Sequence, residues 1–265
     1  MNGPVGMLID VTRCKGCERC VEACKQVNHL GPDQPRRWQR RIDDLSSTRF
    51  TTLDNVSDER SVRVLCRHCV EPACVSACIV GALQKTPIGA VTYDVDRCIG
   101  CRYCMMACPY GIPRYAWANA TPQVRKCTLC YPRISQGQLP ACVEACPYDA
   151  LSFGTRDEML AEGHDRILRE PGRYLPRVWG ENEIGGTSVL YVSDISLDFL
   201  AFKPDMGDRP LPALTWEALS KVPPIVAGGA TLLTGIWWVI QRRMKLQADG
   251  SEPEDEAPGE HGGES

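Results

Sequence analysis

The sequence predicts an α+β protein in which two cysteine-rich units of short strands and helices precede one C-terminal transmembrane helix. Two observations carry this prediction: sixteen cysteines gather in four groups, and residues 222–240 contain no charged side chain. With 265 residues, 43 % of them apolar, the chain can bury a core, which excludes wholesale disorder. The net charge of −3 argues against nucleic-acid binding, because it provides no basic field for a phosphate backbone.

The sixteen cysteines fall into four groups of four with none left over. Groups one and three share the spacing C-x2-C-x2-C-x3-C, whereas groups two and four begin C-x2-C, have a wider gap and close with C-x3-C. In order, the groups are Cys14, Cys17, Cys20, Cys24; Cys66, Cys69, Cys74, Cys78; Cys98, Cys101, Cys104, Cys108; and Cys127, Cys130, Cys142, Cys146.

The residues around the cysteines also repeat. The pattern D-V-x-R-C-x-G-C at Asp10–Cys17 returns at Asp94–Cys101, and P-A-C-V-x-A-C at Pro72–Cys78 returns at Pro140–Cys146. Such self-similarity indicates an internal duplication. Residues 5 to about 155 are therefore expected to hold two units, each built from two motifs.

Short β-rich runs predict strands at Val5–Val11, Ala90–Val95 and Leu151–Phe153, next to the cysteine groups. Residues 25–62 read as a polar insertion with two prolines. Its basic run, Arg36 to Arg41, is expected to be a solvated loop face, with a docking patch for a partner or anionic lipid as the alternative.

A helix is predicted to begin after Thr155 and to run to about Arg169. Thr155 and Glu158 have the spacing of a capping box, and Pro171 with Gly172 ends the helix.

Nineteen uncharged residues, Val222 to Ile240, predict the transmembrane helix. At ~1.5 Å per residue they span roughly 28 Å, close to the ~30 Å hydrocarbon layer. Trp237 and Trp238 with the basic residues that follow form a plausible interfacial anchor. The alternative is a buried helix of a soluble protein. The tail after Ala248 is acidic and rich in Gly, Pro and Ser, which predicts disorder.

Disulfides, structural zinc and iron–sulfur clusters compete for groups of four cysteines. Neighbouring C-x2-C pairs strain a disulfide, and zinc sites pair two C-x2-C knuckles across a longer gap. Groups one and three instead have the run of two-cluster ferredoxins, and group three ends in the expected Cys108-Pro109. The sequence therefore predicts four [4Fe–4S] clusters, held in two ferredoxin-like two-cluster units.

In such runs the fourth cysteine ligates the neighbouring cluster, so the clusters come in pairs. Spacing alone permits pairing group one with group two or with group four. His68, inside group two, is expected to be a hydrogen-bonding neighbour, because cysteines already fill the ligand count. No phosphate-binding loop, nucleophile elbow or carboxylate pair is evident, which predicts an electron carrier without a substrate site of its own.

These motifs resemble the four-cluster, ferredoxin-like electron-transfer subunits of membrane-bound respiratory oxidoreductases. The resemblance rests on the stretches Cys66–Cys78, Gly100–Tyr110 and Lys126–Cys130, and on Gly185–Thr187 ahead of a single span. It is strongest for the iron–sulfur subunit of hydrogenase-2-type [NiFe] hydrogenases, followed by the beta subunit of membrane-bound formate dehydrogenase.

The resemblance implies a nested set of cluster ligands. The sets are Cys14, Cys17, Cys20, Cys146; Cys66, Cys69, Cys74, Cys108; Cys98, Cys101, Cys104, Cys78; and Cys127, Cys130, Cys142, Cys24. The chain then divides into one ferredoxin-like unit at 1–60 and 112–175, a second at 61–111, a wrapping extension at 176–221, the transmembrane helix at 222–241 and a disordered tail at 242–265.

The resemblance further implies a catalytic partner at one end and a multi-spanning quinone-reacting or haem subunit in the membrane at the other. The catalytic partner is expected to be a [NiFe] hydrogenase, with a molybdenum or tungsten enzyme such as formate dehydrogenase or a respiratory reductase as the alternative. A membrane-tethered zinc scaffold is the alternative of another class.

The side of the membrane follows from charge. Three basic residues after the span against two before it favour a cytoplasmic tail, which would place the clusters on the extracytoplasmic, periplasmic side. Members of the hydrogenase type usually begin with a twin-arginine export signal, and no such pair precedes the first predicted strand. We therefore expect a removed signal, export with a signal-bearing partner, or a cytoplasmic location.

Overall fold

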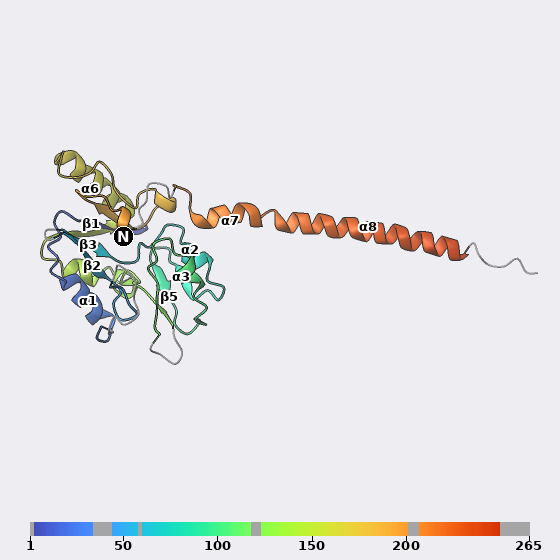
Figure 1. Ribbon diagram of the computed structural model, residues 1–265, viewed down its shortest axis with the longest axis horizontal. Coiled ribbons are helices and arrows are strands. Elements are labelled where there is room, and N and C mark those ends of the chain that lie inside the picture. The colour runs from blue at the N-terminus through green and yellow to red at the C-terminus, as the bar shows by residue number, and fades with distance from the viewer. Residues whose placement is uncertain (1–2, 34–43, 58–59, 118–122, 201–206, 250–265) are drawn as a thin grey trace, which may run out of the picture. The chain divides into compact units, whose positions relative to one another are not determined.

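The computed structural model describes residues 3–33, 44–57, 60–117, 123–200 and 207–249 (Figure 1). Residues 1–214 form one compact unit and residues 215–265 a second. The strands are β1 (Val5–Asp10), β2 (Thr52–Ser57), β3 (Arg60–Val64), β4 (Leu83–Lys85), β5 (Val91–Tyr93), β6 (Arg114–Tyr115), β7 (Val124–Arg125), β8 (Leu151–Thr155) and β9 (Val189–Val192). The helices are α1 (Arg19–Val27), α2 (Ala73–Ser76), α3 (Tyr103–Ala107), α4 (Tyr131–Ile134), α5 (Ala141–Glu144), α6 (Arg156–Arg169), α7 (Leu211–Leu219) and α8 (Val222–Asp249), with 3-10 turns η1 (Glu183–Gly185) and η2 (Asp198–Leu200).

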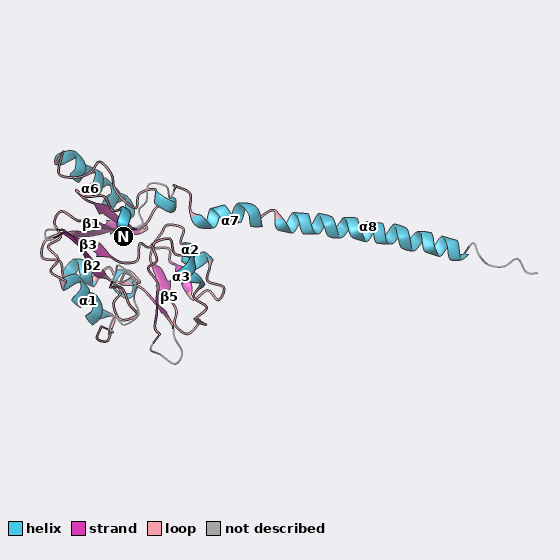
Figure 2. Cartoon of the chain, in the orientation of Figure 1, coloured by secondary structure: helices cyan, strands magenta, loops and turns pink. Residues whose placement is uncertain are grey.

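Short strands and short helices alternate along the compact unit, which confirms the predicted α+β class (Figure 2). The largest sheet has the order β8-β1-β9, with β8 antiparallel and β9 parallel to the central strand β1. All six residues of β1 are buried. One face of this sheet packs Leu8 and Leu190 against Met159 of α6. The other face joins the main core, which reaches the cysteines of groups one, two and four.

The predicted elements at the two ends of this sheet are present. β1 and β8 match the first and last predicted strands, and β5 is a shorter version of the middle one. Helix α6 ends at Arg169, as expected. Its capping box is complete: Glu158 N–H donates to Thr155 Oγ1 at 3.3 Å, and Thr155 N–H donates to the Glu158 carboxylate at 2.8 Å.

Six of the nine strands among the described residues were not predicted, and three of these, β4, β6 and β7, have only two or three residues. Part of the polar insertion at residues 25–62 forms β2 and the start of β3, which pair as an antiparallel hairpin; β3 is mostly buried. The segment treated as a wrapping extension contributes β9, whose four residues are all buried beside β1. The basic run Arg36 to Arg41 lies outside the described residues.

Helix α8 contains the predicted span and extends beyond it to Asp249. Within the part of the chain that the structure describes, one helical stretch is long and apolar enough to cross a membrane. None of its apolar window is buried within the chain, unlike the buried helix of a soluble protein. The expectation of disorder from residue 242 on is therefore wrong for residues 242–249, which continue the helix, and residues 250–265 lie outside the described residues.

Candidate metal centres

A repeated turn leads into cysteine groups one and three. Asp10 and Asp94 each accept a 3.0 Å hydrogen bond on Oδ1 from the backbone N–H two residues later. The arginine of each motif then reaches the other carboxylate oxygen, Arg13 at 3.3 Å and Arg97 at 3.2 Å. This Asx turn explains why the sequence repeat includes the aspartate and the arginine as well as the cysteines.

The residue before the second cysteine is left-handed in all four groups. Its φ is 67° at Gly16, 49° at His68, 70° at Gly100 and 57° at Leu129. This conformation turns the backbone N–H back toward the first thiol of the group, and Leu129 N–H lies 3.3 Å from the sulfur of Cys127. Glycine adopts it without strain, whereas histidine and leucine hold it at a cost of about 1–3 kcal/mol.

Short helices present the remaining cysteines and bring the groups together in pairs. α1 and α5 carry cysteines of groups one and four and pack against each other, and α2 packs against α3 in the same way for groups two and three. Pro72 and Pro140 occupy equivalent positions just before α2 and α5. Group one therefore lies beside group four, and group two beside group three.

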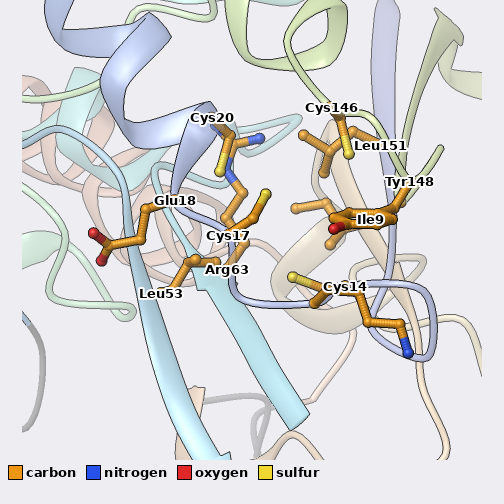
Figure 3. Close-up of a pocket in the computed structure, with 12 residues that line it drawn as sticks. Ile9, Cys14, Cys17, Glu18, Cys20, Leu53, Arg63, Cys146, Tyr148 and Leu151 are labelled. Atoms are coloured by element: carbon orange, nitrogen blue, oxygen red, sulfur yellow. The ribbon is translucent and has the colours of Figure 1, made fainter. Parts of the chain in front are cut away.

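Two cavities are lined by cysteines from different groups. Figure 3 shows the sulfur atoms of Cys14, Cys17, Cys20 and Cys146 around one common space, with Arg63 at its wall. The second cavity is lined by Cys78, Cys98, Cys101 and Cys104. In each cavity three thiols of one C-x2-C-x2-C run meet the last cysteine of another group.

The other eight thiols also form two neighbourhoods, since they lie close enough to raise one another's pKa. Cys69 and Cys74 are both influenced by Cys66 and Cys108. The second of these neighbourhoods joins group four to the last cysteine of group one. The pKa of Cys24 is raised by Cys130 and Cys142, and that of Cys127 by Cys24 and Cys130.

Thiols of different sets approach each other at three places. Cys20 is influenced by Cys142, Cys127 by Cys66, and Cys74 by Cys104. These mutual pKa effects order the four sets in one row. The row begins with the set of Cys14, Cys17, Cys20 and Cys146, continues through the sets that contain Cys24 and Cys66, and ends with the set that contains Cys98.

Burial makes most of these thiols reluctant to ionise. It raises the pKa of Cys24 and Cys74 to about 12 and that of Cys104 to about 11, with neighbouring thiols adding to the shift. At Cys98 the burial effect is outweighed by hydrogen bonds from Tyr93 and the backbone, so its pKa is lowered. A thiol of this kind gives up its proton when a metal binds its sulfur, which couples metal binding to proton release.

Two buried cations, Arg63 and Lys126, and half-buried Lys85 accompany the thiols. Arg63 is 2 % exposed, and its charge lowers the pKa of Cys20 and Cys24 against the effect of burial. Lys85 Nζ donates to the carbonyls of Cys69 and Gly89, each at 2.7 Å, and Lys126 Nζ donates to the carbonyls of Val91 and Cys127 at 2.5 and 2.9 Å.

A buried ammonium held only by neutral carbonyls is costly unless an anion lies nearby. Iron–sulfur clusters ligated by four thiolates carry a net negative charge, so this environment fits them. The donor set fits as well, because soft thiolates suit iron–sulfur clusters. Among the described residues, no three Cys, His, Asp or Glu side chains form a site for a single metal ion.

His68 is a hydrogen-bonding neighbour, as predicted. It is fully buried, and its Nδ1 accepts a 2.9 Å hydrogen bond from Val91 N–H, which places the proton of the neutral ring on Nε2. Burial lowers the pKa of His68, and the nearby Lys126 and Lys85 charges lower it further. The sequence analysis did not identify the cations. Arg63 and Lys85 belong to no motif, and Lys126, which directly precedes Cys127 in one of the stretches that carry the resemblance, was not singled out as a charge near the thiols.

Comparison with known proteins gives the same chemistry. Residues 61–156 match the family model described as a 4Fe-4S dicluster domain. The chain is 37 % identical to hydrogenase-2 operon protein HybA of Escherichia coli O157:H7, over 75 % of this chain and 72 % of the relative. It is 40 % identical to the B subunit of the anaerobic dimethyl sulfoxide reductase of E. coli K12, over 67 % of this chain and 84 % of the relative.

A third relative is the iron–sulfur subunit of the nitrate-inducible formate dehydrogenase of E. coli K12. The identity is 37 %, over 71 % of this chain and 67 % of the relative. The relatives therefore share most of their length with this chain, and their names cover three kinds of oxidoreductase.

Proposed function

This chain belongs to the family of ferredoxin-like iron–sulfur subunits of respiratory oxidoreductases, and from that premise we propose that it relays electrons between a hydrogenase catalytic subunit and a quinone-reacting membrane subunit. It is an electron-transfer subunit with four [4Fe–4S] clusters, to which its sixteen cysteines correspond. When bound, each cluster accepts and returns one electron. The chain needs no substrate site of its own for this role.

The nested ligand sets are part of the proposal. Cys14, Cys17, Cys20 and Cys146 would hold the first cluster and Cys78, Cys98, Cys101 and Cys104 the last, and the two cysteine-lined cavities support these sets. Cys24, Cys127, Cys130 and Cys142 would hold the second cluster and Cys66, Cys69, Cys74 and Cys108 the third, supported by the mutual pKa effects of these thiols.

The single observation that carries the function is the unbroken row of thiol sets. Adjacent sets approach through Cys20 and Cys142, through Cys127 and Cys66, and through Cys74 and Cys104. A row of this kind gives an electron successive sites from one end of the compact unit to the other. The protein's part is to hold the sets in place and to exclude water, since most of the thiols are buried or half-buried.

The membrane partner is proposed from α8. A continuous apolar helix of this length would anchor the subunit and pack against a multi-spanning quinone-reacting or haem subunit. The cluster unit is proposed to lie on the extracytoplasmic side, because Arg242, Arg243 and Lys245 follow the span and favour a cytoplasmic tail.

A molybdenum or tungsten partner is the second candidate. The similarity to the dimethyl sulfoxide reductase B subunit and to a formate dehydrogenase subunit is as high as that to HybA, which supports this alternative. The row of thiols is compatible with either partner, because each needs only a cluster near its own redox centre.

Metal analysis of the complex tests the proposal. The complex is purified anaerobically in mild detergent, and its metals are measured by mass spectrometry. We expect sixteen iron atoms from this chain, four per cluster, together with nickel from the catalytic subunit. Molybdenum or tungsten without nickel would replace the hydrogenase with the second candidate, and zinc without iron would contradict the electron-transfer function.

A further inference from the structure

We propose that Lys85, Lys126 and Arg67 give the cluster at Cys66, Cys69, Cys74 and Cys108 a higher reduction potential than its neighbour at Cys78, Cys98, Cys101 and Cys104, so that an electron in this pair of clusters rests on the former. We call the four ligands of the first cluster the Cys66 set and those of the second the Cys98 set. The inference rests on the proposed function, because it takes the nested ligand sets as given.

Lys85 and Lys126 bring two positive charges to the Cys66 set. Lys85 Nζ donates to Cys69 O at 2.7 Å, and its charge lowers the pKa of the Cys69 thiol against the larger effect of burial. Lys126 is 3 % exposed, and its charge lowers the pKa of the Cys74 thiol against the larger effect of burial. In the described part of the chain, neither ammonium forms an ion pair, so no carboxylate neutralises these charges.

Arg67 adds a third cation on another side of the set. It is 2 % exposed, and its guanidinium lies 4.4 Å from the ring centroid of Tyr191 and 5.7 Å from that of Tyr110. The thiols of Cys66, Cys69 and Cys108 each raise the pKa of Arg67, against the larger lowering effect of burial. The aromatic rings hold the guanidinium without cancelling its charge, because they are neutral.

The Cys98 set has a different environment. The groups that hydrogen-bond Cys98 are neutral: the hydroxyl of Tyr93 and the backbone N–H groups of Gly100 and Val124. Arg102 lines the cavity but is exposed and lies over the rings of Tyr115 and Trp117, at 5.5 and 5.4 Å. Arg97 is 58 % exposed and pairs with Asp94. Water and salt screen such exposed charges.

The difference in environment sets the direction of the effect. Reduction adds one negative charge to a cluster, and a buried cation stabilises that charge far more than an exposed one does, because the local dielectric is low. Cluster potentials respond to nearby charge and hydrogen bonds in this way. The Cys66 set has two buried cations, Arg67 and Lys126, together with half-buried Lys85. Among the described residues near the Cys98 set, Arg97 and Arg102 are exposed, and half-buried Arg125 acts on Tyr93.

The position of the Cys66 set in the row determines where the higher reduction potential would hold an electron. This set lies inside the row, between the set joined through Cys127 and the set joined through Cys104. Within this pair, an electron would therefore rest on the inner cluster and not on the one at the end of the row. The Cys98 set, at one end, would carry the electron only briefly.

Removal of one charge in the intact complex tests the proposal. Lys85→Met removes a cation, Lys85→Arg keeps it, and Arg102→Met removes the exposed cation of the neighbouring set. Each purified complex is titrated anaerobically with dithionite while the reduced clusters are followed by electron paramagnetic resonance. Cys104→Ser, which alters the Cys98 set, identifies that set's component in the wild-type titration.

We expect Lys85→Met to shift one component to a more negative potential by more than it shifts any other. That component should be distinct from the one assigned by Cys104→Ser and should lie above it in wild type. Lys85→Arg and Arg102→Met should leave both in place. Lys126→Met should move the same component as Lys85→Met, and Lys85→Met alone decides the test if that second variant does not fold.

Two results would overturn the proposal. One is a Lys85→Met complex with full iron and four unshifted components; the other is a wild-type order in which the Cys98 set has the higher potential. A wild-type complex without the sixteen irons would instead contradict the proposed function, and the charge inference would fall with it. Iron content therefore separates the two failures.

Discussion

Asp10 is the one fully buried carboxylate among the described residues, and its partners come from distant parts of the chain. Its Oδ2 accepts hydrogen bonds from Arg166 at 3.1 Å and from Tyr174 at 2.9 Å, while Thr12 donates to Oδ1. The equivalent residue of the second repeat, Asp94, keeps the local turn but is 43 % exposed. Asp10 therefore connects distant segments of the compact unit, whereas Asp94 stabilises only its own turn.

A matched pair of substitutions tests this difference at the residue scale. Asp10→Asn should destabilise the compact unit by about 3 kcal/mol, because it leaves the buried guanidinium of Arg166 with only Glu162 as an ionic partner. Asp94→Asn should cost less than about 1 kcal/mol, as expected for an exposed ion pair.

The measurement is the midpoint temperature at which the visible absorbance of the clusters is lost on heating. Equal losses for the two variants would show that the turn geometry, and not the buried network, determines stability. The wild-type iron content of each variant before heating serves as the control.

Helix α6 shows how an element that lies far from the clusters supports them. Its capping box begins directly after β8, and its Met159 packs beneath Leu8 of β1 and Leu190 of β9. Arg156 in its first turn donates to the carbonyls of Thr187 and Glu181, at 2.9 and 2.7 Å. The start of this helix therefore fixes the loop that leads into β9.

Removing the cap tests this support at the scale of the element. Thr155→Ala should lower stability by about 1 kcal/mol, since Glu158 N–H loses its acceptor at the helix start. Thr155→Ser, which keeps the hydroxyl, should restore most of the loss. The midpoint of denaturant unfolding measures both, and an unstable serine variant would contradict a capping role.

Local patterns predicted the elements that depend on nearby residues. The cap of α6, β1 and the long apolar helix each leave a signature within a few residues. The strand β9 was missed although Val189–Val192 is apolar, because its place depends on a parallel partner near the other end of the chain. β2 was missed because its residues are half polar and pair with β3 across a short connection.

The candidate site divides in the same way. Cysteine spacing marked all sixteen cysteines as candidate ligands, which remains a prediction, and in the structure their thiols lie in four neighbourhoods. Spacing could not choose which groups pair, because that depends on the packing of α1 on α5 and of α2 on α3. The cations were beyond prediction, since Arg63 and Lys85 reach the thiols from strands β3 and β4 that carry no motif.

At the scale of the whole molecule, the helical stretch that contains α8 is the one part of the described chain that is long and apolar enough to cross a membrane. Deletion of residues 222–249 should release the subunit into the soluble fraction, while its visible spectrum stays that of the full chain. A matched variant that replaces these residues with a different apolar helix of equal length should remain bound. Retention of the deleted form after a carbonate wash would mean that α8 is not its anchor.

The central position of β1 has a consequence for biosynthesis. This first strand pairs with β8 and β9, so its register with β9 is set only when Val192 has been made. Contacts between such distant segments slow folding, because a long loop must close before they form. In the nascent chain the first cysteine group therefore follows a strand whose parallel partner is missing until most of the compact unit has been made. The first four thiols are synthesised well before the sheet beside them is complete.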